Sequence, residues 1–279
     1  MKILKYLTCS LAMLAFAASC DKHEILFETE PAPGAEFQLH YFEPITNTST
    51  NYIDSVYVND KLLSGIDGGG NLATYNGIPG GSTGRFFAVE PGEVNFKFFR
   101  KGDVVYNQTM TLTAGKQNII VHDLEKPAII LDNGYPYQHV SGLASAATWN
   151  TDSLATVKFV NVMYEEAGKP YEGKLQYQWQ NPRTKEWENL GNPVGFGEAT
   201  DRCPILIVKS VFNSSGYCRI DYRILDENGE VFQHYNSGGK LTNYSDYWNG
   251  YIGRSYMHFL SGIRLNKSTR VAVKQWTSL

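Results

Sequence analysis

Apolar and polar residues alternate along several short segments of the chain. Every second residue of the segment 93–99 is apolar, and the same period of two runs through 174–180 and 217–224. A period of two is typical of antiparallel strands that are buried on one face. Turn-forming pairs such as Pro91-Gly92 separate these segments, and no long stretch has the period of a helix. The sequence therefore predicts an all-β protein.

The predicted strands fall into two groups on either side of a run of small residues at 141–147. About seven strand candidates lie in the first group, the number that a β-sandwich needs. The first group opens with a predicted strand at 37–42, and the second group opens with a similar one at 157–162. This similarity favours a tandem of two related, Ig-like, antiparallel β-sandwiches. The predicted organisation is a signal peptide at 1–19, a lipidated tether at 20–35, a first β-sandwich domain at 36–140, a linker at 141–155 and a second β-sandwich domain at 156–279.

The beginning of the chain has the features of a secretory signal. A short basic start is followed by a mostly apolar run at 6–18 that is too short to span a bilayer. The small residues 17–19 lead directly into Cys20, and this arrangement resembles the lipobox of bacterial lipoproteins. The resemblance implies that Cys20 carries lipid such as palmitate and becomes the first mature residue. The alternative is simple cleavage near the A-x-A-like residues 15–17, which leaves Cys20 an ordinary thiol.

The residues after Cys20 bear on the membrane that holds the anchor. The stretch 21–24 is charged and contains two acidic residues. Such a stretch resembles the surface-export signal of Bacteroidetes lipoproteins, which implies an outer-membrane protein that faces the extracellular side. In enterobacterial lipoproteins an aspartate at position 21 would instead favour retention in the inner membrane.

Composition limits the partners of the mature chain. The whole sequence has 279 residues with 25 Lys and Arg and 28 Asp and Glu, and two of the lysines lie in the predicted signal. The mature balance is therefore 23 against 28, a net charge of −5. There is no basic stripe, so nucleic acid is not an expected partner. The lipid anchor is the expected contact with the membrane.

Two cysteines, Cys203 and Cys218, lie in the predicted second domain. The segments 203–212 and 217–225 are predicted to form a hairpin around the turn 213–216. In such a hairpin the two cysteines would be about 26 Å apart, far beyond the reach of a disulfide. We therefore expect no bond between them.

Three segments of the first predicted domain resemble an uncharacterised family of bacterial lipoprotein domains. They are the strand-turn-strand segment 56–63 and the segments 89–96 and 111–120. Members of the family are secreted or surface proteins with Ig-like or transthyretin-like sandwiches and no known catalytic residues. The resemblance covers the first predicted domain well and the second only loosely. It implies a fold and carries no chemistry.

Possible catalytic and metal-binding motifs are present, but the residues around them do not match what these motifs require. Gly80, Ser82 and Gly84 match G-x-S-x-G, but this motif needs a preceding strand and a following helix. Here it lies in a glycine-rich stretch that is followed by a predicted strand. The histidines are scattered, without the spacing of a zinc site. We predict no catalytic residues, no metal and no cofactor.

The segment 241–256 is rich in aromatic and small polar residues, a composition typical of binding surfaces. One interpretation is an exposed face for a glycan or peptide. The other, to which we give slightly more weight, is a short packed helix, because four of its aromatics follow i, i+3, i+4, i+7 spacing. Trp187, beside a predicted turn, is a further candidate. The candidate ligand-binding residues are Tyr244, Tyr247, Trp248, Tyr251 and Trp187.

Taken together, these features predict a non-enzymatic outer-membrane lipoprotein that binds a ligand or partner. The resemblance to Bacteroidetes lipoproteins implies an accessory role in glycan or peptide uptake beside a TonB-dependent transporter. The alternative is a structural surface adhesin or a fimbria-like subunit, and a hydrolase is the least favoured class.

Overall fold

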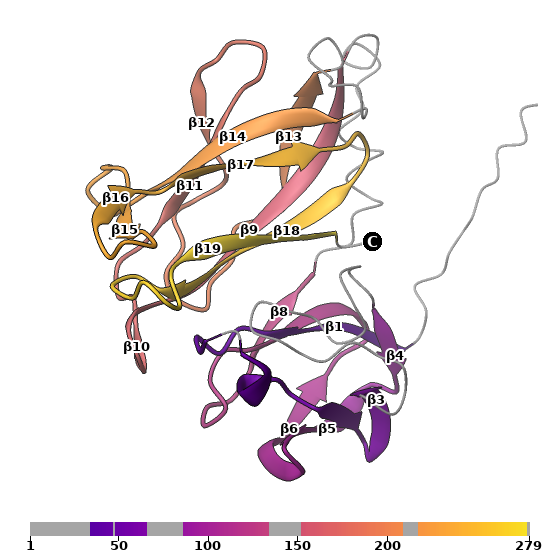
Figure 1. Ribbon diagram of the computed structural model, residues 1–279. Helices are drawn as coiled ribbons and strands as arrows, with labels where there is room; N and C mark the ends of the chain where they lie inside the picture. Colours follow the sequence, from indigo (N-terminus) through magenta and orange to yellow (C-terminus); the bar gives the residue numbers. More distant parts are fainter. Residues whose placement is uncertain (1–33, 47, 66–85, 134–151, 209–216, 278–279) are drawn as a thin grey trace, which may run out of the picture. The chain divides into compact units, whose positions relative to one another are not determined.

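A computed structural model describes residues 34–46, 48–65, 86–133, 152–208 and 217–277. The chain from Pro33 to Leu279 forms one compact unit. In the described residues, regular structure consists of nineteen strands and one 3₁₀ turn, η1(Ser49–Asn51), so the all-β prediction is confirmed (Figure 1). None of these described ranges contains a helix with the length and apolar character needed to cross a bilayer.

Two four-stranded sheets come from the N-terminal half. In the first, β1 and β7 pair in parallel, while every pair in the second is antiparallel. Sheet I has the order β4(Phe87–Val89), β1(Ala35–Tyr41), β7(Gly115–Val121), β8(Ile129–Asp132). Sheet II has the order β3(Lys61–Gly65), β2(Ser55–Val58), β5(Gly92–Arg100), β6(Asp103–Leu112).

The β2–β3 connection shows how local sequence sets local structure. Asn59 and Asp60 form the turn with positive φ angles of 49° and 61°. Asn and Asp tolerate this left-handed conformation, and two such residues in succession match the twist of a tight hairpin. The strand-turn-strand prediction for 56–63 is therefore confirmed.

Alternation places one face of β5 in the core between sheets I and II. Val94, Phe96 and Phe98 are completely buried, as the period of two predicts. The ring of Phe96 meets Phe37 of β1 edge-on, with centroids 5.3 Å apart and planes at 84°. Edge-on contact between rings adds to the free energy gained from burying their apolar area.

The C-terminal half contributes two larger sheets and a small one. In sheet III, β9 and β18 pair in parallel, so in each half the first long strand has a parallel partner later in the chain. Sheet III has the order β13(Cys203–Val208), β9(Asp152–Glu166), β18(Ser255–Ile263), β19(Ala272–Thr277), and β10(Lys169–Pro170) also pairs with β9. Sheet IV has the order β12(Trp187–Asn189), β11(Gln176–Gln180), β14(Cys218–Leu225), β17(Ser245–Gly250), and β15(Gln233–Tyr235) pairs with β16(Leu241–Asn243).

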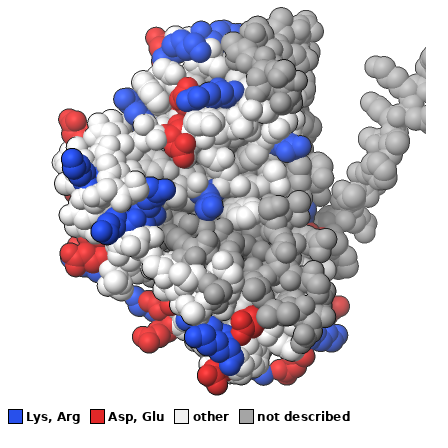
Figure 2. All heavy atoms as spheres, viewed as in Figure 1, with Lys and Arg blue, Asp and Glu red and all other residues white. Residues whose placement is uncertain are grey.

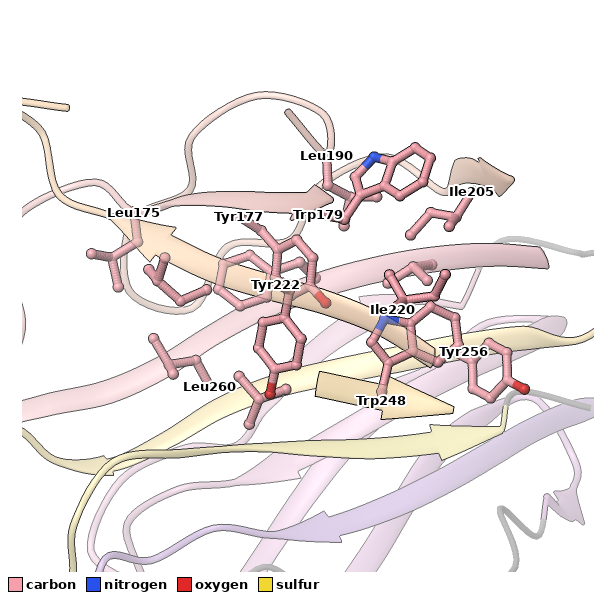
Figure 3. Packing of buried hydrophobic residues seen from close by; sticks show 14 of the residues in the cluster. Leu175, Tyr177, Trp179, Leu190, Ile205, Ile220, Tyr222, Trp248, Tyr256 and Leu260 are labelled. Atoms are coloured by element: carbon pink, nitrogen blue, oxygen red, sulfur yellow. The ribbon is translucent and has the colours of Figure 1, made fainter. Parts of the chain in front are cut away.

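The core of this half is rich in aromatic residues (Figure 3). The rings of Tyr177 and Tyr222, on neighbouring strands of sheet IV, are stacked with centroids 5.0 Å apart. Leu175, Tyr177 and Trp179 are buried, and so is every second residue of β14 from Cys218 to Ile224. The predicted alternation in 174–180 and 217–224 is confirmed.

A third buried cluster combines residues of sheets I and III. Phe42 and Ile120 from the N-terminal half pack with residues of β9 and β18, among them Phe259. A polar group lies beside this cluster. Nε2 of His40 is 3.0 Å from Oε1 of Gln38 and 3.1 Å from Oδ1 of Asn118. The strands of sheet I therefore bury side chains on both faces.

The predicted hairpin between 203–212 and 217–225 is wrong. Strand β13 pairs with β9 in sheet III, whereas β14 pairs with β11 and β17 in sheet IV. Alternation shows that a segment is a half-buried strand, but it does not say which strand lies beside it. No disulfide joins Cys203 to Cys218, as expected, although the argument for it assumed the wrong pairing.

The signal peptide, Cys20 and residues 21–33 of the tether lie outside the described residues, as does the Gly80–Gly84 motif. The last residue of the predicted tether, Ala35, already belongs to β1. Strand β9 begins at Asp152, within the predicted linker. The domain boundaries and the Ig-like class of the two halves remain predictions.

Candidate functional site

The aromatic segment 241–256 is not helical. It contains β16, β17 and the start of β18. Tyr244 and Trp248 are 4% and 2% exposed, whereas Tyr247 is 47% exposed. A spacing of four is even, so a strand places residues 244 and 248 on one face just as a helix does. The helical interpretation is therefore wrong, and the strand separates these aromatics by face.

Tyr244 and Trp248 belong to the core. The hydroxyl of Tyr244 accepts a hydrogen bond of 2.8 Å from the backbone N–H of Val273, and burial raises the pKa of this tyrosine to about 12. The indole of Trp248 meets the ring of Tyr256 at 4.7 Å between centroids. Figure 3 shows Trp248 and Tyr256 side by side in this core. Neither Tyr244 nor Trp248 is placed to contact a ligand.

Tyr251 follows β17 and is partly buried. Its ring lies 5.7 Å from that of Tyr217, and Cζ of Arg254 lies 4.3 Å from its centroid. Its backbone N–H donates to the hydroxyl of Tyr256 at 3.1 Å. Tyr251 is therefore outside the strands of sheet IV and is held by its own local contacts.

Tyr247 and Trp187 lie on the same face of sheet IV. Tyr247 is opposite Asp221 on β14, and Trp187 is opposite Gln180 on β11. Because the residues that alternate with Asp221 and Gln180 are buried, both pairs face away from the core. β12 and β17 are the two edges of this sheet, so at about 4.8 Å per strand the two aromatics are roughly 14 Å apart.

An arginine lies against each of these two rings. Cζ of Arg219 is 3.9 Å from the centroid of Tyr247, and Cζ of Arg223 is 4.4 Å from the centroid of Trp187. Both distances are within the range of cation–π attraction. Asp221 accepts hydrogen bonds from Nε and Nη2 of Arg219, at 3.0 and 2.8 Å, which further orients this guanidinium.

A chain of hydrogen bonds connects three strands of the same face. Nε of Arg223 donates to Oε1 of Gln178 at 2.9 Å, and Nε2 of Gln178 donates to Oδ1 of Asn189 at 2.7 Å. An arginine can only donate, so it determines which end of the Gln178 amide is the acceptor. Gln178 in turn determines the orientation of the Asn189 amide. The polar row is thus arranged before any ligand arrives.

A hollow of about 700 Å³ adjoins this chain. Gln176, at the start of β11, is 8% exposed, and its Nε2 donates to the carbonyl oxygen of Tyr177 at 2.9 Å. Acidic and basic side chains both contribute to the wall. The hollow is lined by Glu172, Lys174, Gln176, Gln178, Asn189, Pro193, Leu225, Asp226, Glu227 and Gly229. The outer face of sheet IV together with this hollow is the candidate functional site.

The strongest electrostatic perturbations lie elsewhere, in the hydrophobic interior. Burial lowers the pKa of His40 and of His258 to about 3, and it raises the pKa of Tyr177 well above its usual value. Desolvation of the charged form is the largest cause of all three pKa shifts. Within the described ranges, no three His, Cys, Asp or Glu side chains are grouped to hold a metal ion.

The sequence analysis selected Trp187 and Tyr247 but missed their partners. Arg223, Gln178 and Asn189 were not among the candidates, although the first two lie on the polar face of predicted strands. The signal that could have found them is the polar half of the alternation in 174–180 and 217–224. That half contains glutamines on one strand and arginines on the other.

Comparison with known proteins gives no family for this chain. No family profile and no curated protein matches the sequence. Among solved structures, a leucine-rich repeat protein from Bacteroides thetaiotaomicron has a TM-score of 0.20 and 9% identity, over 85% of this chain and 27% of that one. The TIE protein of Bacillus anthracis has a TM-score of 0.20 and 7% identity, over 82% of this chain and 34% of that one.

A third solved structure is of similar length. It is a protein from Bacteroides uniformis named for a suspected role in cell adhesion, with a TM-score of 0.24 and 10% identity, over 88% of this chain and 98% of that one. This chain thus spans about a quarter to a third of the first two proteins and nearly all of the third. Likeness at these scores does not identify a function.

Proposed function

We propose that this chain is a non-enzymatic cell-surface protein that makes adhesive contacts through the outer face of sheet IV. The observation that carries the proposal is the pair of arginine–aromatic stacks, Arg219 on Tyr247 and Arg223 on Trp187. Tyrosine, tryptophan and arginine are the residues that contribute most to binding at protein surfaces. Their presence together on one open sheet face favours a recognition surface.

The rigidity of this face supports the same conclusion. Ordering a long side chain on binding costs about 0.5–1.5 kcal/mol, and this cost is smaller where the side chain is already held. Arg219 is held by Tyr247 and Asp221, and Arg223 is held by Trp187 and Gln178. The predicted lipid anchor at Cys20 would place this surface outside the cell.

Adhesion assays with whole cells test the proposal. Cells that display the full-length protein are compared with cells that display the double variant Trp187→Ala/Tyr247→Ala, on surfaces coated with glycans, extracellular proteins or other cells. Val104, which is 52% exposed on β6 of sheet II, provides the control variant Val104→Ala. We expect adhesion to fall at least tenfold in the double variant and to be unchanged in the control. Equal adhesion of all three would overturn the proposal.

The competing proposal is an accessory subunit of a transporter. The two proposals differ in the partner that each one requires. The full-length protein, solubilised from outer membranes in mild detergent, would then copurify with a TonB-dependent transporter in a fixed ratio. Recovery of the protein without such a partner, together with face-dependent adhesion, supports the adhesin. Ordered polymers on the cell surface would instead support a fimbria-like subunit.

A further inference from the structure

We infer that the hollow beside sheet IV binds an uncharged oligosaccharide, with Gln176, Gln178 and Asn189 as its polar contacts. The inference rests on the proposed function and gives the adhesive face a ligand class. The fixed orientation of three amides, the charges around them and the apolar part of the wall favour this ligand.

The orientation of Asn189 follows from Arg223. Arg223 donates to Gln178 at 2.9 Å, and Gln178 donates to Oδ1 of Asn189 at 2.7 Å. Because Oδ1 of Asn189 is occupied by Gln178, the Nδ2 group is the end of this amide that can still bind a ligand. No described atom accepts a hydrogen bond from Nδ2. Asn189 lines the hollow, so it presents a hydrogen-bond donor of fixed position there.

Gln176 presents the opposite polarity. Its side chain is almost completely buried, and its Nε2 donates to the carbonyl oxygens of Tyr177, Leu190 and Gly191 at 2.9, 3.4 and 3.3 Å. These contacts fix the amide and leave Oε1 as the acceptor, which receives no hydrogen bond from a described atom. A hydroxyl group both donates and accepts, so neighbouring hydroxyls of a sugar match this pair of amides.

The charges of the wall argue against an anionic ligand. Lys174 is the one basic residue of the described wall, against the acidic Glu172, Asp226 and Glu227. A sulfated or uronate-containing glycan would meet this net negative charge. Carboxylates accept hydrogen bonds from hydroxyls without needing a counter-charge. On the face drawn in Figure 2, acidic and basic side chains both occur across the described surface.

Apolar contacts and size complete the match. Leu225 and Pro193 form the apolar part of the wall and can pack against the C–H face of a sugar ring. The volume of about 700 Å³ lies within the range of small-ligand sites, about 300–1,000 Å³. A short oligosaccharide fits this combination of amides, carboxylates and apolar patches better than a long apolar molecule.

The test measures binding of the full-length protein in detergent to three sets of probes. These are neutral gluco-, manno- and galacto-oligosaccharides of two to six units, sulfated or uronate oligosaccharides of the same lengths, and basic peptides. We expect saturable binding to at least one neutral oligosaccharide. The variants Gln178→Ala and Asn189→Asp should weaken this binding at least tenfold. Gln178→Ala removes the side chain that connects Arg223 to Asn189 by hydrogen bonds, and Asn189→Asp replaces the Nδ2 donor with an acceptor oxygen.

A matched control exists in the same half of the molecule. Nε2 of Gln233 donates to Oδ1 of Asn243 at 3.1 Å, an exposed amide pair between β15 and β16. Gln233→Ala should leave oligosaccharide binding unchanged. Unfolding curves of all variants show whether each one is folded, and binding is compared only between variants with equal melting temperatures. Arg223→Ala, which also frees the Gln178 amide, replaces any variant that fails to fold.

The outcomes separate this inference from the proposed function. Binding of none of the neutral probes, binding of only sulfated sugars or basic peptides, or neutral binding that Gln178→Ala and Asn189→Asp leave intact would each overturn the inference. If adhesion still depends on Trp187 and Tyr247 in that case, the adhesive function stands without this ligand. If neutral sugars bind but cells do not adhere, the ligand class stands and the adhesive function fails.

Discussion

The hydroxyl oxygen of Tyr177 lies 3.1 Å from Nδ1 of His258 in the core between sheets III and IV. The histidine ring is completely buried and meets the indole of Trp248 at 5.0 Å, nearly at a right angle. Among the described residues, its Nε2 atom has no hydrogen-bond partner. A charged imidazole in this place would lack both solvent and a counter-ion, so burial lowers the pKa of His258 to about 3.

This burial predicts that stability depends on pH. In the unfolded chain the pKa of a histidine is 6.5, so as pH falls below 6.5 the unfolded state binds a proton that folded His258 does not. The contribution of His258 to the free energy of unfolding is therefore largest above pH 6.5. It falls between pH 6.5 and about 3, by roughly 1.4 kcal/mol per pH unit for this one group.

The variant His258→Gln checks this prediction. Glutamine does not titrate, so urea unfolding at pH 4.5, 5.5 and 7 should show a slope smaller by about one proton than in the unchanged protein. His40, whose pKa is lowered to about 3 by the same cause, gives a second instance in His40→Gln. An unchanged slope in both variants would show that these rings are not held neutral in the folded state.

Neighbouring residues on β17 should respond very differently to truncation. Trp248 is in the core, so Trp248→Ala should lower the free energy of unfolding by about 3–5 kcal/mol. Tyr247 faces outward, so Tyr247→Ala should change it by no more than about 1 kcal/mol. Denaturant unfolding measures both. Equal losses would contradict the assignment of the two side chains to opposite faces.

Gly262 on β18 should not tolerate a side chain. Its φ is +109°, and an added Cβ would lie 2.5 Å from the carbonyl oxygen of Arg270. Backbone strain alone costs about 1–3 kcal/mol, and the clash adds to it. Gly229, with φ of +81° and nothing within 4 Å of an added Cβ, is the matched control. Urea midpoints should place Gly262→Ala clearly below Gly229→Ala, and the reverse order would refute the close approach.

Phe259 should contribute to the stability of both halves of the chain and to their cooperative unfolding. It is completely buried, and its ring lies 4.4 Å from that of His40 and 5.0 Å from that of Phe42. Phe259→Ala should cost about 3–5 kcal/mol because it leaves a cavity in the third cluster. It should also separate calorimetric unfolding into two transitions. Phe99→Ala, at a partly exposed position of β5, should keep a single transition.

Several elements could be predicted from local pattern. The buried faces of β5, β11 and β14 follow from alternation, and the β2–β3 turn follows from the adjacent Asn59 and Asp60. Each of these depends on residues that are near one another in the chain. Of the candidate site, local composition selected Tyr247, in an aromatic-rich segment, and Trp187, beside a predicted turn.

Other features depend on contacts between distant residues. The sequence could not show that β13 joins β9 while β14 joins β11, because pairing is decided by which long-range arrangement buries the most apolar area. The sequence also could not show that Tyr247 and Trp248 lie on opposite faces. They follow Tyr244 by three and four residues, and this spacing is typical of one face of a helix. Only the strand pairing of β17 assigns them to opposite faces.

By itself, then, the sequence determined that the chain is built of half-buried strands, because a period of two is a local property of every strand. The tertiary structure decided which polar side chains come together in the candidate functional site. It brings Arg223, Gln178 and Asn189 into contact from β14, β11 and β12, and no local pattern connects these three residues. The reason is physical: the contacts run across the sheet, perpendicular to the chain.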